Sequence, residues 1–193
     1  MGFHRVGITP NALSVVSLVF AALAGGVFFV ATRERPELML VAGALVAANA
    51  LLDALDGKLA RLTKQETRRG DYLDHVIDRY ADVFILGGLA LSPVGNVYWG
   101  LGAVSGVLLT SYMGTQAQAL GLGRDYGGLL GRADRLVLLM AMPFVAWYVF
   151  VSDIHLPWDA SPMTLLLAWF ALVGNVTAIQ RFAKGWKELG AGK

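Results

Sequence analysis

Apolar residues along the chain gather in six long runs, separated by short polar or Pro- and Gly-containing connectors. A helix needs about 20 apolar residues to cross the hydrocarbon core of a bilayer, and every run is close to that length. The runs cover residues 11–31, 38–58, 71–92, 96–119, 133–151 and 162–182. The pattern predicts an all-α integral membrane protein with six transmembrane helices, in which short connectors make neighbouring helices antiparallel.

Composition agrees with this interpretation and removes several classes of protein. The chain is 56% hydrophobic and only 16% charged, whereas soluble domains carry about a quarter charged residues. The spans and connectors use nearly all of the 193 residues, so we expect one membrane domain over residues 1–193. The net charge of +2 is too small to indicate a nucleic-acid partner. Since cysteine is absent, a metal site must use oxygen or histidine ligands.

The distribution of Lys and Arg predicts the orientation in the membrane. If the N-terminus is cytoplasmic, thirteen of these residues fall on the cytoplasmic side, Arg33 and Arg35 fall outside, and Arg79 lies within a span. This is a strong positive-inside bias. We therefore expect a multi-pass protein of the cell membrane with both termini in the cytoplasm.

Aspartates cluster in and around the second and third apolar runs. An ionised aspartate at the centre of a span costs at least about 2.5 kcal/mol, so a group of them needs a wet cavity, a partner charge or a metal. In the third run they recur every three or four residues and share one helix face. The short, basic connector 62–69 makes these two helices an adjoining antiparallel pair joined on the cytoplasmic side, so both sets can meet near that surface. The residues are Asp53, Asp56, Asp71, Asp74, Asp78 and Asp82.

Two arrangements would relieve the repulsion among these carboxylates. A divalent cation is one, and all-oxygen carboxylate ligands suit Mg²⁺, Mn²⁺ or Ca²⁺. The other is an ion-pair network with nearby arginines, expected in particular for Asp82 with Arg79. His75 is expected to contribute hydrogen bonding or helix packing rather than ligation, because its side chain is rotated about 100° from that of Asp74. The arginines considered for the network are Arg61, Arg68, Arg69 and Arg79.

The aspartates stand in a longer motif, Asp53-Ala-Leu-Asp56-Gly57-Lys-Leu-Ala60-Arg61, then eight residues, Gly70, three residues, Asp74, three residues and Asp78. This resembles the D-x2-D-G-x2-A-R-x8-G-x3-D-x3-D motif of the CDP-alcohol phosphotransferase (CDP-alcohol phosphatidyltransferase) family, with a match at every fixed position. By overall resemblance, including the segment 131–135, the chain is most similar to archaeal members that make archaetidylinositol phosphate or archaetidylglycerol phosphate.

The resemblance implies a metal-dependent phospholipid-synthesis enzyme. In such an enzyme Asp53, Asp56, Asp74 and Asp78 surround Mg²⁺ or Mn²⁺, as two ions, which contact the diphosphate of a CDP-linked lipid. Asp78 takes the proton from the acceptor hydroxyl, or acts as a metal ligand only. A homodimer and an active site on the cytoplasmic side are also implied.

The resemblance assigns further residues to the CDP-lipid pocket, and an ordinary structural role stands beside each assignment. Gly57 and Gly70 allow close backbone approach or serve helix packing. Thr67 lies near the cytidine or in a solvated loop. The segment Thr9-Pro10-Asn11 reaches the nucleotide or starts the first helix, with Thr9 as its cap. The residues expected at the pocket are Asn11, Asp56, Gly57, Ala60, Arg61, Thr67 and Gly70.

A second basic group, Arg124, Arg132 and Arg135, lies between the fourth and fifth runs on the side of the aspartates. Arg132 and Arg135 are three residues apart at a helix start and could converge on one phosphate. The alternative is that their positive charge only sets the orientation of the helices in the membrane. This favours a phosphorylated polyol acceptor. Inositol phosphate users carry further basic residues after a Ser-Tyr pair, and these are missing from 113–118, which leaves glycerol phosphate a comparable candidate.

The predicted function is therefore transfer of a phosphatidyl or archaetidyl group from CDP-diacylglycerol or CDP-archaeol to inositol phosphate or glycerol phosphate, with release of CMP. One alternative is transfer to a non-phosphorylated alcohol such as serine or inositol. An alternative from another class is a cation or proton transporter, because buried carboxylates in a helical bundle also mark ion pathways.

Overall fold

The computed structural model describes residues 9–63, 67–123 and 127–191, and the secondary structure in these ranges is helical throughout. A short 3-10 helix, η2, covers Pro157–Asp159. The six α-helices are α1 (Pro10–Val30), α2 (Glu37–Thr63), α3 (Arg68–Ala90), α4 (Val97–Ala119), α5 (Arg132–Val151) and α6 (Pro162–Ala191). The all-α prediction is confirmed, and each predicted run lies on a helix.

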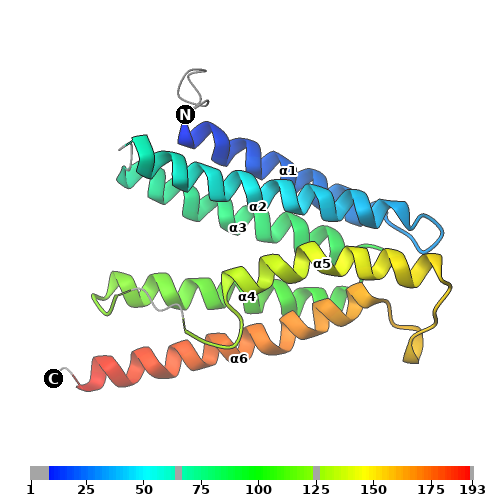
Figure 1. The fold of residues 1–193 in the computed structure, drawn as a ribbon. Helices are drawn as coiled ribbons and strands as arrows, with labels where there is room; N and C mark the ends of the chain where they lie inside the picture. The colour runs from blue at the N-terminus through cyan, green and yellow to red at the C-terminus, as the bar shows by residue number, and fades with distance from the viewer. Residues whose placement is uncertain (1–8, 64–66, 124–126, 192–193) are drawn as a thin grey trace.

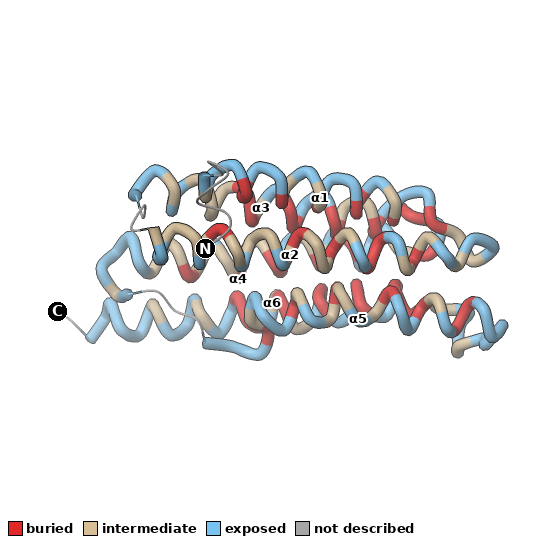
Figure 2. Tube along the Cα trace, turned by 45° about the horizontal axis from the view of Figure 1, so that its top comes forward, coloured by how far each residue is buried: buried red, intermediate tan, exposed pale blue. Residues whose placement is uncertain are grey.

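Four of these helices, α1, α2, α5 and α6, are long and apolar enough to cross a membrane. The helix α3 falls outside this group because charged side chains occupy its first four turns. Large apolar side chains nevertheless lie exposed along the outer faces of the helices, among them Leu23 and Phe29 of α1 and Phe182 of α6. Figure 2 shows the same division, with buried residues turned toward neighbouring helices. Such a surface suits lipid rather than water.

The helix starts follow local sequence signals. The Thr9 side chain accepts a hydrogen bond from the Ala12 N–H at 3.3 Å, and Pro10 stands in the first turn of α1, which confirms the predicted cap. Thr67 caps α3 in the same way, with the Gly70 N–H donating to its hydroxyl at 3.0 Å. The helices α2 and α6 continue beyond their apolar runs, to Thr63 and Ala191. Good helix formers occupy the extension of α2, so its backbone stays helical after the hydrophobic pattern ends.

α1 packs against both α2 and α3, and α4 packs along α6 (Figure 1). α5 packs mainly against α2 and also contacts α6, and α3 contacts α4, so α5 and α3 join the two sets. In the described residues α2 and α3 make little direct contact. The sequence predicted that they form an adjoining antiparallel pair, and this needs correction: they run antiparallel, but α1 bridges them.

Close approach between α1 and α3 depends on two glycines. A Cβ built on Gly88 would lie 2.1 Å from the Gly25 carbonyl oxygen, and one on Gly25 would lie 2.2 Å from the Phe84 carbonyl oxygen. No side chain fits at these separations, so the small residues let the backbones touch. The start of α1 and the end of α6 lie at the same end of the bundle as the α2–α3 and α4–α5 connections (Figure 1).

Candidate active site

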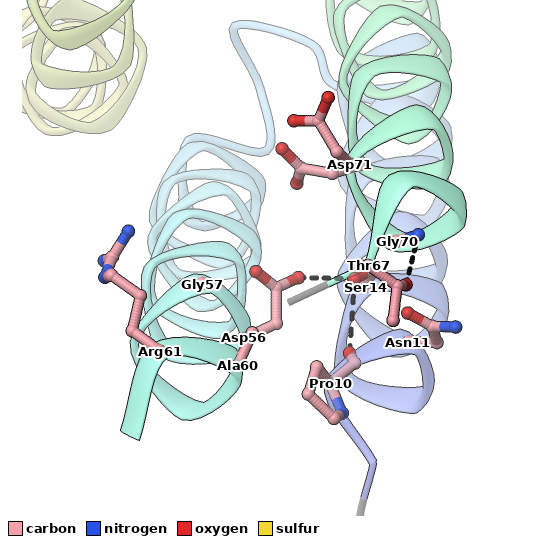
Figure 3. A pocket seen from close by; sticks show the side chains of 11 residues that line it. Pro10, Asn11, Ser14, Asp56, Gly57, Ala60, Arg61, Thr67, Gly70 and Asp71 are labelled. Carbon is pink, nitrogen blue, oxygen red and sulfur yellow. Dashed lines mark hydrogen bonds between the residues drawn. The ribbon is translucent and has the colours of Figure 1, made fainter. Parts of the chain in front are cut away.

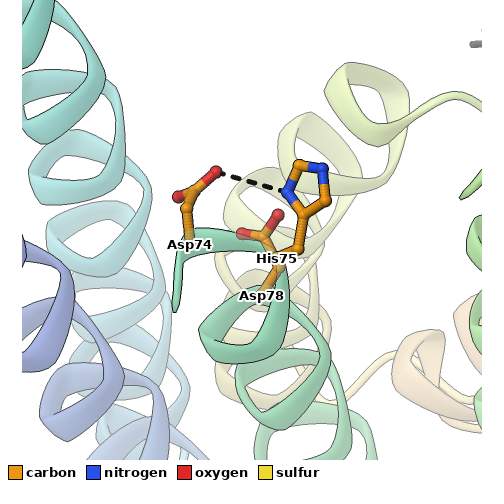
Figure 4. A group of neighbouring side chains, drawn as sticks. All are labelled: Asp74, His75 and Asp78. Atoms are coloured by element: carbon orange, nitrogen blue, oxygen red, sulfur yellow. Dashed lines mark ion pairs between the residues drawn. The ribbon is translucent and has the colours of Figure 1, made fainter. Parts of the chain in front are cut away.

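The aspartates of α2 and α3 meet across the space that α1 leaves between these helices. Asp53, Asp56 and Asp74 each offer a carboxylate oxygen, and the three oxygens lie within 4.8 Å of one another. Asp74 also belongs to a second group, with His75 and Asp78, of the same compactness (Figure 4). The four motif aspartates therefore form two adjoining groups that share Asp74.

These groups fit a divalent cation. Three carboxylates so close together repel unless a positive charge lies among them, and their hard oxygen donors suit Mg²⁺ or Mn²⁺. His75 lies nearer to this centre than the sequence predicted. Its Nδ1 is 3.7 Å from an Asp74 oxygen and its Nε2 is 3.9 Å from an Asp71 oxygen. The Nδ1 atom is buried with no hydrogen-bond partner among the described residues.

Arginines already neutralise part of the cluster. Arg132 contacts Asp53 at 2.6 Å and also donates to Asp78. Arg79 lies 3.3 Å from Asp78 and 3.7 Å from Asp82, so the predicted Arg79–Asp82 pair is confirmed. The ion-pair network exists, but two of its three arginines come from α5. In the described residues, ion pairs to the aspartates from the other expected arginines are absent; these are Arg61, Arg68 and Arg69.

The three arginines predicted to bind the acceptor phosphate do not form one cluster. Arg124 lies outside the described residues. Arg135 is buried, with a side chain 5% exposed, and pairs with Asp82 at 3.0 Å. Arg132 stands at the first position of α5 with a side chain 41% exposed. The expected convergence of Arg132 and Arg135 on one phosphate needs correction, because burial against Asp82 keeps Arg135 away from the surface.

A cavity of about 270 Å³ opens beside the aspartates, between α1, α2 and the start of α3 (Figure 3). All seven residues predicted for the CDP-lipid pocket line it, although they come from three helices and a connector. They are Asn11, Asp56, Gly57, Ala60, Arg61, Thr67 and Gly70. Pro10, Ser14, Asp71 and Asp74 complete the lining. The pocket therefore adjoins the first carboxylate group.

The two motif glycines differ in their surroundings. A Cβ on Gly70 would lie 3.2 Å from the Thr67 hydroxyl and 3.4 Å from the Asn11 side-chain oxygen, which is tight. A Cβ on Gly57 would meet only the Arg61 guanidinium, at 3.8 Å. Helix packing therefore does not explain the glycine at position 57. At position 70, crowding by neighbouring side chains explains part of the requirement for glycine. Thr67 is exposed in the connector, where it caps α3 and also lines the cavity, so a place near the cytidine and a solvated loop position both stay open for it.

Sequence reasoning missed Ser14. Its hydroxyl donates to an Asp56 carboxylate oxygen at 2.6 Å, and both side chains are buried (Figure 3). This bond fixes the direction in which Asp56 points. A signal was present in the sequence, because Asn11, Ser14 and Ser17 are polar positions spaced by three residues in an otherwise apolar run and so share one helix face.

Comparison with known proteins decides the class. A model of the CDP-alcohol phosphatidyltransferase family matches residues 7–178. This chain belongs to the CDP-alcohol phosphatidyltransferase family. It is accordingly a membrane-bound transferase of phospholipid synthesis, and the resemblance carried by the aspartate motif is confirmed.

Relatives of this phosphatidyltransferase come from archaea and bacteria. The archaetidylinositol phosphate synthase of Pyrococcus horikoshii is 32% identical over 97% of this chain and 88% of its own length. The phosphatidylinositol phosphate synthase of Mycobacterium marinum is 30% identical over 98% of this chain and 79% of its own length.

Solved structures share the fold. The crystal structure of the Mycobacterium tuberculosis phosphatidylinositol phosphate synthase with CDP-DAG bound matches with a TM-score of 0.76 and 25% identity, over 96% of this chain and 90% of that one. A structure of the same enzyme in complex with manganese and citrate gives the same TM-score and identity, over 96% of this chain and 86% of that one.

Proposed function

We propose that this enzyme transfers a phosphatidyl or archaetidyl group from a CDP-linked lipid to a phosphorylated polyol and releases CMP. The observation that carries the proposal is the meeting of the four motif aspartates beside a cavity lined by all seven predicted pocket residues. The relatives' names, which specify synthases of inositol phosphate lipids, support the same reaction.

The donor fits the site by charge and shape. The cavity beside Asp56 would take the CDP moiety, with Gly57 and Gly70 leaving room for it and the guanidinium of Arg61 available to a phosphate. One or two ions, Mg²⁺ or Mn²⁺, would be held by Asp53, Asp56, Asp74 and Asp78. Bound there, they would neutralise charge that develops on the diphosphate during the reaction.

Asp78 is the proposed general base. Its carboxylate takes the proton of the acceptor hydroxyl while the hydroxyl oxygen bonds to the lipid-side phosphorus. The bond from that phosphorus to the bridging oxygen breaks, and CMP leaves with the electron pair. Asp78 is buried, which keeps bulk water from competing with the acceptor for this proton.

The acceptor is proposed to be inositol phosphate or glycerol phosphate, with its phosphate bound by Arg132. The relatives' names favour inositol phosphate, whereas the absence of basic residues from 113–118 leaves glycerol phosphate open. Arg124, on the connector before α5, stays a proposed contributor. A non-phosphorylated alcohol such as serine or inositol would leave Arg132 without a phosphate partner.

The experiment uses the purified protein in lipid nanodiscs with Mg²⁺, CDP-archaeol or CDP-diacylglycerol, and one acceptor at a time from inositol phosphate, glycerol phosphate, serine and inositol. We expect CMP release with a phosphorylated polyol and a product lipid of the matching mass. Asp78→Asn should lower turnover at least about 100-fold while CDP-lipid binding is partly retained. Failure to release CMP with every donor and acceptor would contradict the proposal.

We also propose six membrane spans with both termini and the active site on the cytoplasmic side. Support comes from the positive-inside bias and from the shared position of α1's start and α6's end. The buried charged residues of the described chain, Asp56, Asp78, Asp82 and Arg135, do not extend to the opposite end, which disfavours a transporter. A homodimer rests on family resemblance alone, and native mass spectrometry of the solubilised protein would test it.

A further inference from the structure

Arg132 lies between the two carboxylate groups and touches one member of each. Its guanidinium is 2.6 Å from Asp53, which belongs to the group with Asp56 and Asp74, and it also bonds to Asp78, which belongs to the group with His75. We propose that Arg132 exchanges partners during the reaction: it gives up Asp53 and Asp78 when these carboxylates ligate a divalent cation, and it then binds the acceptor's phosphate. Only the second step, binding of the acceptor's phosphate, rests on the proposed function.

The exchange is required by the pairing of Asp78. One of its carboxylate oxygens bonds to Arg132 and the other lies 3.3 Å from Arg79, so both are engaged by guanidinium groups. A carboxylate in this condition cannot ligate a cation fully, because a guanidinium occupies each of its oxygens. One arginine must therefore leave before Asp78 can complete a cation site.

Arg132 is the arginine able to leave. The Arg79 side chain is 26% exposed and is shared with buried Asp82, so its departure would strip a buried carboxylate of a partner. The Arg132 side chain is 41% exposed, and within the described part of the chain its ion pairs are with the two motif aspartates alone. Its guanidinium can regain water as it moves, which lowers the cost of breaking both ion pairs.

The backbone beneath Arg132 is fixed, whereas its side chain is partly exposed. Asp134 accepts a hydrogen bond from the Gly131 N–H at 3.0 Å and closes the first turn of α5. One turn further, buried Arg135 holds α5 to Asp82 of α3 at 3.0 Å. A cation at Asp53 and Asp78 would repel the guanidinium from this anchored position toward solvent, beside the place from which an acceptor phosphate must approach.

The exchange links the two binding events. A guanidinium that competes with the cation for Asp53 weakens cation binding, and the same guanidinium, once released, strengthens phosphate binding. The coupling is reciprocal by thermodynamic linkage and falls typically between about 5-fold and 150-fold. Arg132 thus keeps the carboxylates compensated when no cation is bound and makes acceptor binding follow cation binding.

The test measures Mn²⁺ binding by electron paramagnetic resonance in nanodiscs that contain neither donor nor acceptor. Arg132→Gln removes the competitor, so we expect the Mn²⁺ dissociation constant to fall at least about 5-fold. With Mn²⁺ saturating, the dissociation constant for inositol phosphate or glycerol phosphate should rise at least about 10-fold. Opposite shifts are the signature, because a merely structural role would weaken both ligands.

Arg69→Gln is the matched control, since it makes the same charge change on an exposed first-turn residue of α3; its Mn²⁺ affinity should stay within about 2-fold of the wild type. Arg132→Lys covers the case in which Arg132→Gln does not fold, and should tighten Mn²⁺ by a smaller factor because one ammonium bridges two carboxylates poorly. Unchanged or weaker Mn²⁺ binding in the folded variants would overturn the exchange. Because this readout needs no turnover, it separates failure of the exchange from failure of the proposed reaction.

Discussion

Single residues at this site are constrained by the space and charge around them, and Gly57 illustrates the constraint by space. Its position on α2 has room for a Cβ, with only the Arg61 guanidinium at 3.8 Å, and alanine favours a helix over glycine by about 1 kcal/mol. The chain nevertheless has glycine where α2 lines the 270 Å³ cavity. We therefore expect the absent side chain to serve the ligand rather than the fold.

Gly57→Ala should leave the melting temperature unchanged or slightly raised while it increases KM for the CDP-lipid at least about 10-fold, the usual effect of one extra methyl group in a fitted pocket. Steady-state kinetics and a thermal melt on the same preparation measure both quantities. Gly26→Ala is the control, because a Cβ there meets nothing within 4 Å and lies on α1 away from this cavity. An unchanged KM for Gly57→Ala would show that the bound donor does not contact α2 at this position.

The metal-ligand candidates and their neighbour Arg79 could be predicted from the sequence, but the arginine partner from α5 could not. Motif spacing places Asp74 and Asp78 one turn apart on α3 whatever surrounds them. Which arginine reaches Asp53 depends on how α5 packs, and Arg132 is 79 positions away from it along the chain. Long side chains from distant helices leave no periodic signal, and this is why Arg68 and Arg69 were plausible partners and Arg132 was assigned to phosphate alone.

Helices as elements were predicted well in number and place, and less well in their contacts and ends. The hydrophobic pattern reports where a helix faces lipid or core, so it did not predict the polar extensions at the ends of α2 and α6. The short connector between α2 and α3 also predicted that these two helices pack against each other. The structure instead places α1 against both, since glycines at 25 and 88 allow close approach, and this separation leaves the space in which the aspartates meet.

The molecule as a whole presents an apolar outer surface and carries most of its Lys and Arg residues at one end. In our account that end, with the start of α1, the end of α6 and the candidate active site, faces the cytoplasm. The opposite end carries Arg33 and Arg35 as its only Lys or Arg residues under the six-span interpretation, and this charge bias of the connectors favours the proposed orientation.

The chain has no cysteine, so single-cysteine variants report orientation without background. With a membrane-impermeant maleimide on whole cells, Glu34→Cys in the α1–α2 connection should be labelled. Lys187→Cys near the end of α6 should be labelled only after the membrane is permeabilised. Both positions are exposed in the structure. The reverse labelling pattern would refute the proposed orientation.

The central claim is that the motif aspartates hold divalent cations against the diphosphate of a CDP-linked lipid. The most direct measurement is ³¹P electron–nuclear double resonance on the Mn²⁺-loaded protein in nanodiscs, with and without CDP-diacylglycerol or CDP-archaeol. We predict a ³¹P coupling from donor phosphorus directly beside the ion, absent without donor and lost in Asp74→Asn, because Asp74 belongs to both carboxylate groups. Mn²⁺ that binds the protein in the presence of donor without any ³¹P coupling, or a coupling that Asp74→Asn leaves intact, would contradict the account.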